Sequence, residues 1–273
     1  MLGTDLQAAL AGRDVTAVTR AELDVTDASA VSAAVAGHDV VINAAAYTKV
    51  DDAESDEAAA YAVNATGAGN LAAAAAATGA RLVQVSTDYV FDGTATEPYA
   101  ESTPVAPVSA YGRTKAEGER LVLEAHRDRT YIVRTAWLYG QHGPNFAKTM
   151  LTLAGRLDTV AVVTDQVGQP TWTLDLAKQI VALLDADAPA GIYHGTASGQ
   201  GSWFDFAGAV FAGAGLDPDR VTPTDSSAFV RPAPRPAYSV LGHDAWADAG
   251  LSPMRDWRQA LDEAFSTGAL TAS

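Results

Sequence analysis

The sequence predicts an α/β fold in which helices cover both faces of a parallel sheet. Strand and helix patterns alternate through the first half of the chain, an order that requires parallel strands joined by crossover helices. The strand patterns are apolar at consecutive positions, as in "RLVQVS" (81–86), which is expected when both faces of a sheet are covered. The length of 273 residues suits one large domain, or a domain with a smaller appendage.

The elements follow in order from the first residue. Leu2, Leu6 and Leu10 recur at the spacing of one helical face, so a helix begins almost at Met1. The long alanine-rich segment further on opens with acidic residues, which favour a helix N-terminus. Strands are expected at 14–20, 38–46, 81–91 and 130–140, and further helices at 27–37, 54–80 and 110–126.

The pattern thins after about residue 140. Stretches that contain proline and glycine, such as "GQHGPN" and "RPAPRPAY", alternate there with short helical patterns. We therefore expect a main α/β domain over residues 1–140 and a smaller region over 141–273 that is partly interleaved with the sheet.

Composition excludes several classes of partner. The 33 acidic residues outnumber the 18 basic ones and give a formal net charge of -15, so the surface repels nucleic acid and anionic membranes. No apolar run reaches membrane-spanning length, and cysteine is absent, which excludes disulfides and thiolate metal sites. The 5 histidines show no metal-ligand spacing. We expect a cytoplasmic protein without a metal site, nucleic-acid partner or membrane partner.

Candidate chemistry lies in the middle of the chain. Thr87 stands near the end of a predicted strand, at the edge of the sheet where open α/β folds bind ligands. Tyr111 and Lys115 stand four apart on a predicted helix and so share one face. An ammonium beside a phenol lowers the phenol's pKa, and such a tyrosine can give a proton to an alkoxide formed when hydride reaches a carbonyl. Thr87 would hydrogen-bond the same oxygen.

The Tyr-x-x-x-Lys spacing alone is a weak signal, because tyrosine and lysine fall four apart by chance in many sequences. Its position strengthens it, since it follows a strand end that carries threonine in a doubly wound pattern.

An ordered set of motifs makes the chain resemble the extended short-chain dehydrogenases/reductases, and within them the dTDP-4-dehydrorhamnose reductase family. The resemblance runs from Gly3 to about residue 265. The motifs are "VINAAAYTKVDDAE" (41–54), "VNATG" (63–67), "STDYVFDG" (86–93), "YGRTKAEGE" (111–119), "RTAWLYG" (134–140), "NFAKTM" (145–150), "DQVGQPT" (165–171) and "RPAYS" (235–239). The resemblance implies a Rossmann-like fold and a catalytic triad of Thr87, Tyr111 and Lys115, with Tyr111 as proton donor.

The resemblance also implies NADPH as the cofactor, with NADH as the alternative. Lys115 would bond the nicotinamide ribose, beside Tyr111. The other implied cofactor residues are Gly3, Arg20, Asp24, Val25, Ala44, Ala45 and Ala46. Arg20 would meet the 2′-phosphate, although a solvated arginine fits the position nearly as well. The three alanines also suit a packed strand–helix turn, and Asp24 suits a helix N-terminus.

For the substrate, the resemblance implies a cleft for a dTDP-sugar. Trp137 would cover the sugar ring, and Arg235 would hold the diphosphate because its guanidinium can bind phosphate oxygens in pairs, with Arg231 as the neighbouring alternative. The remaining implied substrate residues are Thr87, Asp88, Tyr89, Asn145, Phe146, Gln166, Gly168, Pro170 and Thr171.

The opening stretch "MLGTDLQAAL" aligns with the tail of the family's glycine-rich fingerprint, where Gly3 takes the place of the last glycine. On this alignment the first strand and two earlier glycines would precede Met1. We therefore expect a sheet without its first strand and weaker binding of the dinucleotide.

The implied activity is NADPH-dependent reduction of the C4 keto group of dTDP-4-dehydro-6-deoxy-L-mannose to dTDP-L-rhamnose, by a monomer or homodimer. Alternatives are another nucleotide-sugar reductase, a 4-epimerase or a dehydratase of the same superfamily. A dehydratase would need an acid pair after Thr87, whereas Asp88 is followed by Tyr89. A regulatory subunit of the methionine adenosyltransferase type is a further, non-catalytic alternative.

Overall fold

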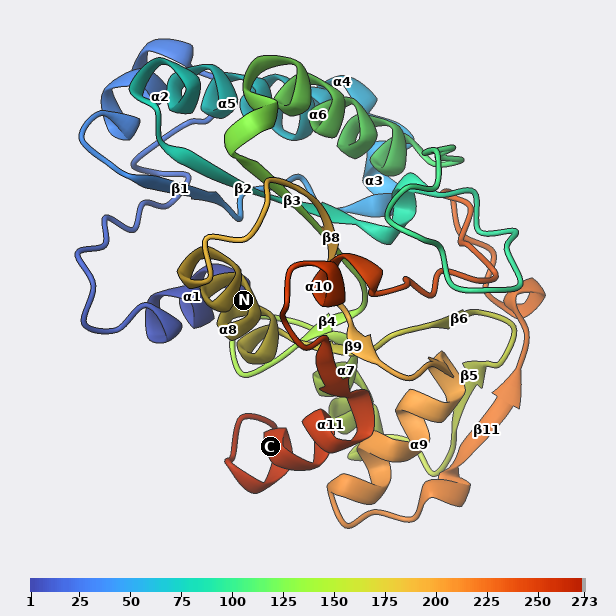
Figure 1. The fold of residues 1–273 in the computed structure, drawn as a ribbon. Helices are drawn as coiled ribbons and strands as arrows, with labels where there is room; N and C mark the ends of the chain where they lie inside the picture. Colours follow the sequence, from blue (N-terminus) through green and yellow to red (C-terminus); the bar gives the residue numbers. More distant parts are fainter. Residues whose placement is uncertain (272–273) are drawn as a thin grey trace.

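The computed structural model describes residues 1–271 and has a parallel sheet at its centre (Figure 1). Its four strands lie in the order β1-β2-β3-β8, and each neighbouring pair is parallel. They are β1 (Val40–Asn43), β2 (Arg81–Thr87), β3 (Thr130–Thr135) and β8 (Gly191–His194). Every residue of β3 is buried, as expected for a strand with helices on both sides. The predicted α/β fold class is confirmed.

One face of the sheet is covered by α2 (Ala28–Val35), α5 (Gly67–Thr78) and α6 (Ala110–His126), which form the upper layer in Figure 1. Val31, Leu71 and Val122 from these helices pack with Leu82 of β2 in one apolar cluster. Helix α6 has the bounds that the sequence predicts.

The other face is covered by α1 (Leu2–Ala9), α8 (Thr173–Asp185) and the short α10 (Asp244–Asp248). Leu2 and Leu6 are buried in a cluster with Val133 of β3 and Ile180 of α8. The helix expected at the first residues is thus present, and its apolar face packs on the core.

Residues after 140 supply both β8 and α8 to the layers of the sheet. Other segments of the same region build most of a second, separate apolar core. Three helices surround that core, α7 (Phe146–Ala154), α9 (Trp203–Gly213) and α11 (Trp257–Ser266), with Phe206 and Trp257 fully buried between them. Paired short strands complete it: β4 (Leu138–Tyr139) with β7 (Thr171–Trp172), β5 (Val160–Val163) with β11 (Val221–Thr224), β6 (Val167–Gly168) with β10 (Gly201–Ser202), and β9 (Ala197–Ser198) with β12 (Met254–Asp256).

The strand expected at 14–20 is wrong. These residues are exposed and form no strand, and Val15 and Val18 are 41% and 50% exposed. In Figure 1 they belong to the loop that leads from α1 to the upper helix layer. An extended segment becomes a strand only where a neighbour takes its backbone hydrogen bonds, and no strand in residues 1–271 pairs with this one.

The long helix expected at 54–80 is divided. After the short α3 (Val50–Ala53), the chain forms α4 (Glu57–Tyr61), a π-helical turn (Ala62–Thr66) and then α5. Asn64 lies in the π turn, where its side chain bonds the backbone of Tyr47 and the hydroxyl of Thr114 on α6. Such single π turns interrupt helices frequently at functional sites.

Three expected strands end earlier than the sequence predicts, and the one expected at 38–46 stops at Asn43. The strand at 81–91 stops at Thr87, and Asp88–Val90 form a 3₁₀ turn, η2. The strand at 130–140 breaks after Thr135, and Trp137 then adopts a left-handed backbone with φ of 47°. A left-handed backbone is unfavourable for a residue as bulky as tryptophan, and residues in such conformations cluster at functional sites.

None of the helices within residues 1–271 has the length and apolar character needed to cross a bilayer.

Candidate active site at the carboxyl edge of the sheet

Thr87 is the last residue of β2 and lies at the carboxyl edge of the sheet. Its side chain is buried, and its hydroxyl donates to Asp88 Oδ1 at 2.9 Å and accepts from the backbone N–H of Tyr89 at 3.2 Å. The 3₁₀ turn that follows is therefore capped by the threonine itself.

Tyr111 lies in the first turn of α6, directly against that 3₁₀ turn. Ser109 caps the helix by accepting from the Gly112 N–H at 3.1 Å. The ring of Tyr111 meets the ring of Tyr89 edge-on, with 5.6 Å between the centroids. The helix start thus places Tyr111 beside the residues that follow Thr87.

Two glycines allow α6 to come this close. A Cβ on Gly112 would lie 2.2 Å from the backbone oxygen of Tyr89, and one on Gly118 would lie 2.1 Å from that of Asn64. Both contacts are with backbone, which cannot move aside as a flexible side chain can. Only glycine fits at these two positions without a shift of the helix.

Lys115 is one turn further along α6 and is buried, with Nζ donating to the Val85 carbonyl at 2.6 Å. Burial lowers the pKa of Lys115 to about 8, and the nearby Glu119 carboxylate acts in the opposite direction. Burial also raises the pKa of Tyr111 to about 12, and the nearby Thr87 side chain acts in the opposite direction. The expected lowering of the tyrosine pKa by Lys115 is therefore wrong, because desolvation of the phenolate dominates. Tyr111 is neutral at physiological pH and carries a proton.

Asp88 is buried at the same place. Burial raises its pKa to about 6. Its Oδ1 accepts from Thr87, and its Oδ2 has no hydrogen-bond partner within residues 1–271. The Ser239 side chain acts on this carboxyl and lowers its pKa, against the larger effect of burial.

The residues expected to hold the cofactor lie partly at this edge. Ala44, Ala45 and Ala46 follow β1, and the first two are exposed. The Asn43 side chain holds their backbone by accepting from the Ala45 N–H at 3.0 Å. Tyr47, next along, packs in one cluster with Tyr111.

The other expected cofactor residues lie outside this cluster. Asp24 is exposed and accepts from the Thr26 N–H and hydroxyl, which lowers its pKa; Arg20 makes a minor contribution in the same direction. Val25 packs on Gly67, where a Cβ would come within 2.6 Å of it. Gly3 lies in the first turn of α1 with open space beside it.

Trp137 is fixed by contacts that the sequence does not reveal. Its ring stacks on Trp203 of α9, with 3.6 Å between centroids and 10° between planes. A Cβ on Gly168 of β6 would lie 2.6 Å from the indole, so glycine leaves room for the ring. Phe146 packs against Trp203 in turn, at 4.5 Å between centroids. The aromatic group thus joins Trp137 and Phe146, near each other in the chain, to Trp203 of α9, far along it.

Several expected substrate residues have their polar groups engaged within the protein. Asn145 caps α7 by accepting from the Lys148 N–H and donates to the Gly140 carbonyl at 2.9 Å. Thr171 is fully buried, and its hydroxyl donates to the Gln169 carbonyl. Pro170 lies between Gln169 and Thr171 and is buried as well. Gln166 donates to the Ser226 hydroxyl at 2.9 Å.

Arg235 is paired with Asp51 of α3, at 2.9 Å between Nη2 and Oδ1. The same carboxylate accepts from the Ala233 N–H at 3.2 Å and lies 3.7 Å from Arg231. The charges of Asp51 and Arg235 both act on Tyr89, so this group adjoins the tyrosine that touches Tyr111. Asp51 was not among the site residues expected from the sequence. The one feature that could have indicated a role for it is its place within the motif "YTKVDDAE".

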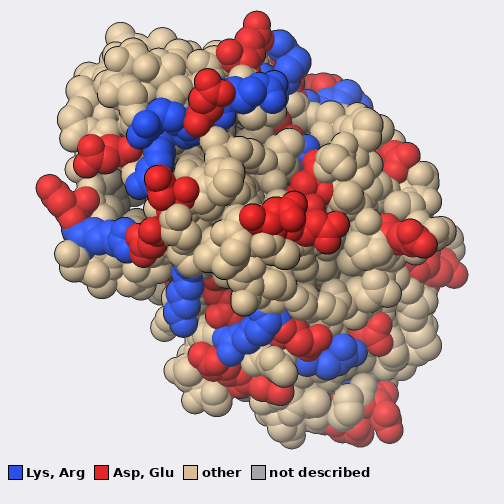
Figure 2. Space-filling model, viewed as in Figure 1, with Lys and Arg blue, Asp and Glu red and all other residues tan. Residues whose placement is uncertain are grey.

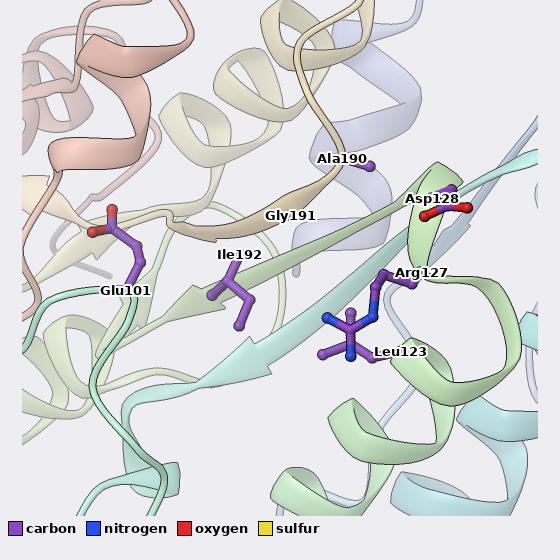
Figure 3. A pocket seen from close by; sticks show the side chains of 7 residues that line it. All are labelled: Glu101, Leu123, Arg127, Asp128, Ala190, Gly191 and Ile192. Atoms are coloured by element: carbon purple, nitrogen blue, oxygen red, sulfur yellow. The ribbon is translucent and has the colours of Figure 1, made fainter.

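On the face in Figure 2, acidic and basic side chains lie interspersed. A groove of about 580 Å³, lined by Gly191 and Ile192 of β8, runs between Glu101 and Arg127 near the end of α6 (Figure 3). It contains none of the catalytic candidates. Among residues 1–271, no three acidic or histidine side chains group as metal ligands would.

The comparison with known proteins identifies the family. The model of the RmlD substrate binding domain matches residues 1–269, nearly the whole chain. The chain belongs to the RmlD family. The resemblance drawn from the sequence motifs is thereby confirmed.

Relatives of this RmlD-family chain are named as nucleotide-sugar reductases. The dTDP-4-dehydrorhamnose reductase of Streptomyces griseus is 53% identical over 97% of this chain and 90% of its own length. The dTDP-4-keto-6-deoxy-D-glucose reductase of Streptomyces niveus is 51% identical over 97% and 93%. The crystal structure of dTDP-4-dehydrorhamnose reductase from Bacillus anthracis, in complex with NADP, is 39% identical and superposes with a TM-score of 0.94 over 97% of this chain and 95% of its own.

Proposed function

We propose that the protein reduces the C4 keto group of dTDP-4-dehydro-6-deoxy-L-mannose with NADPH and so forms dTDP-L-rhamnose. The observation that supports the proposal is that β2 ends at Thr87, that α6 places Tyr111 against Tyr89 just after it, and that Lys115 donates to the Val85 carbonyl of the same strand. The 53% identity to a named dTDP-4-dehydrorhamnose reductase supports the same activity.

The residues at this edge fit a nicotinamide dinucleotide. Small exposed side chains at Ala44 and Ala45 leave space at the end of β1, and Lys115 provides a buried ammonium for the nicotinamide ribose. When bound, NADPH supplies the hydride. By the resemblance to the family, Arg20 and Asp24 would lie near the adenosine end of NADPH, and Val25 would lie beside the adenine.

Proton transfer is the task of the chain's own residues. Tyr111 is neutral because burial raises its pKa to about 12, so it can donate to the oxygen on which negative charge develops. The Thr87 hydroxyl would turn from Asp88 to hydrogen-bond the same oxygen. The Lys115 ammonium would then stabilise the phenolate that Tyr111 becomes, since opposite charges favour the ionised form.

Binding of the sugar nucleotide falls to the region around Trp137. The stacked pair of Trp137 and Trp203 offers an apolar surface to a sugar ring. Arg235, positioned by Asp51, provides the cation for the diphosphate, and its planar guanidinium suits paired phosphate oxygens. Tyr89 touches Tyr111 and is affected by the charges of Arg235 and Asp51, which supports one site for both ends of the substrate.

The choice of sugar is the point at which a second candidate has specific support. The Streptomyces niveus relative is named for dTDP-4-keto-6-deoxy-D-glucose, which carries the same C4 ketone. A dehydratase is disfavoured because Tyr89, and not a second acid, follows Asp88.

The test is turnover by the purified protein with NADPH and each keto sugar in separate reactions. We expect oxidation of NADPH with the L-mannose-configured sugar and a product identified by NMR as dTDP-L-rhamnose. A higher kcat/KM with the D-glucose-configured sugar would move the assignment to the second candidate. Absence of turnover with both, together with stable binding to a methionine adenosyltransferase, would favour the regulatory role.

A further inference from the structure

A buried ion pair lies behind the catalytic residues and has no part in the mechanism above. Arg134 of β3 and Glu119 of α6 have side chains only 2% and 5% exposed. Arg134 Nη2 donates to Glu119 Oε2 at 2.7 Å, and Nε donates to Oε1 at 3.0 Å. The guanidinium therefore binds both carboxylate oxygens, the strongest geometry for such a pair.

A third group ties this pair to β2. The hydroxyl of Ser86 donates to Glu119 Oε1 at 2.5 Å. Ser86 directly precedes Thr87, while Glu119 lies one helical turn beyond Lys115 and two turns beyond Tyr111 on the same face of α6. One carboxylate thus joins the strand that carries Thr87 to the helix that carries the other two catalytic residues.

The surroundings hold Arg134 in this one arrangement. Its guanidinium lies over the ring of Phe91 at 5.0 Å from the centroid. Its Nη1 is 3.4 Å from the Glu101 carbonyl and 3.5 Å from His194 Nε2. Burial and the Arg134 charge lower the pKa of His194 to about 3, so the imidazole stays neutral and adds no second positive charge.

Stability alone does not account for the ion pair. Removing two charges from water is so unfavourable that a well-packed apolar pair in the same space is often as stable or more stable. What a buried pair with fixed hydrogen bonds supplies is a defined geometry, here between β2, β3 and α6. Its carboxylate also acts on the Lys115 ammonium one turn away.

We propose that Glu119 is a positioning residue, which through Ser86 and Arg134 fixes α6 against β2 so that Tyr111 and Thr87 address the same oxygen. The inference rests on the proposed reductase function. It assigns to this triad of Ser86, Glu119 and Arg134 an effect on catalysis beyond its effect on folding.

Two variants test it. Ser86→Ala removes only the bond to β2 and leaves the ion pair intact. The double variant E119M/R134M replaces the pair with apolar chains of similar length. The matched control is Glu117→Gln, the same kind of carboxylate change on the same helix, where Glu117 pairs with the exposed Arg120.

We expect kcat to fall about tenfold to a hundredfold in both variants, because a misplacement of the order of 1 Å has effects of this size. The KM for NADPH and the melting temperature should stay close to those of the parent, and Glu117→Gln should match the parent throughout. A kcat within twofold of the parent in Ser86→Ala and in a folded double variant would overturn the proposal. If the double variant does not fold, Ser86→Ala decides alone.

A second readout separates this proposal from the proposed function. With ¹³C-labelled tyrosine, the ring signals of Tyr111, assigned by their loss in Tyr111→Phe, should shift or broaden in Ser86→Ala and not in Glu117→Gln. If the parent shows no reductase activity, the proposed function fails, and this spectrum still decides whether the triad positions Tyr111. Unchanged Tyr111 signals in Ser86→Ala would contradict the positioning role.

Discussion

At the scale of single residues, burial controls the protonation states at the site. Burial raises the pKa of Tyr111 to about 12, so this residue is neutral, whereas the pKa values of about 8 for Lys115 and about 6 for Asp88 place their charge changes on either side of neutral pH. A charged Lys115 is useful only when Tyr111 gives up its proton, because the ammonium then stabilises the phenolate. In the proposed mechanism the two residues therefore act in sequence, and the protonation of Lys115 determines the pH range.

The predicted consequence is a loss of kcat as pH rises through about 8, where Lys115 loses its proton. Tyr111 keeps its proton up to about 12, so it does not cause this fall. The measurement is kcat at saturating NADPH and substrate across the range, with circular dichroism to show that the fold persists. Lys115→Arg should be slower but should lack the falling limb, since arginine stays charged. A parent profile that stays flat well above pH 8 would refute this role.

At the scale of elements, the position of α6 decides the geometry of the site. Gly112 and Gly118 bring this helix against the backbone of Tyr89 and Asn64. The α/β class, the apolar face of α1 and the bounds of α6 could be predicted, because they depend on patterns of residues that lie close together in the sequence.

Gly118→Ala should destabilise the protein by about 1–3 kcal/mol, the usual effect of overpacking, because its Cβ would meet the Asn64 carbonyl at 2.1 Å. The change should also lower kcat by moving Tyr111 and Lys115. Unfolding in urea measures the first effect. Gly69→Ala on α5 is the matched control, since its nearest neighbour is at 3.5 Å, an ordinary contact. Equal stability of the two variants would show that α6 does not need this close approach.

The features that the sequence analysis did not predict depend on partners distant in the chain. Residues 14–20 have strand-like composition, yet a strand needs a neighbour, which no local pattern shows. The break at Trp137 depends on Trp203 and Gly168, and the raised pKa of Tyr111 depends on how completely the fold buries it. The residue types at the site could be predicted; their contacts could not.

At the scale of the whole molecule, the candidate site brings together segments from the first and the second half of the chain. Asp51 of α3 holds the segment that contains Ala233 and Arg235, more than 180 positions away. Gly93, with φ of 79°, makes room for Pro236 in the same contact. The diphosphate cation proposed here is therefore positioned by a carboxylate of the other half of the molecule.

Asp51→Asn should raise the KM for the dTDP-sugar about tenfold or more while kcat changes little, because a misplaced Arg235 weakens binding more than chemistry. Arg235→Ala should show the same pattern. Asp52→Asn is the control. Asp52 is the next residue after Asp51, but it is exposed and pairs with Lys49 instead of an arginine of the site. Steady-state kinetics with varied sugar nucleotide give these constants. A KM in Asp51→Asn equal to that in Asp52→Asn would show that the Asp51–Arg235 pair serves only the fold.

The central claim is that Tyr111 gives the proton in a carbonyl reduction, and Tyr111→Phe tests it most directly. The ring keeps its edge contact with Tyr89, so binding of the sugar nucleotide, measured by calorimetry, should be nearly unchanged. Loss of the hydroxyl should lower kcat and kcat/KM together by about 10²–10⁴-fold, the usual contribution of general acid catalysis. The decisive measurement is turnover of dTDP-4-dehydro-6-deoxy-L-mannose with NADPH by parent and variant. Activity in Tyr111→Phe of half the parent value or more would contradict the account.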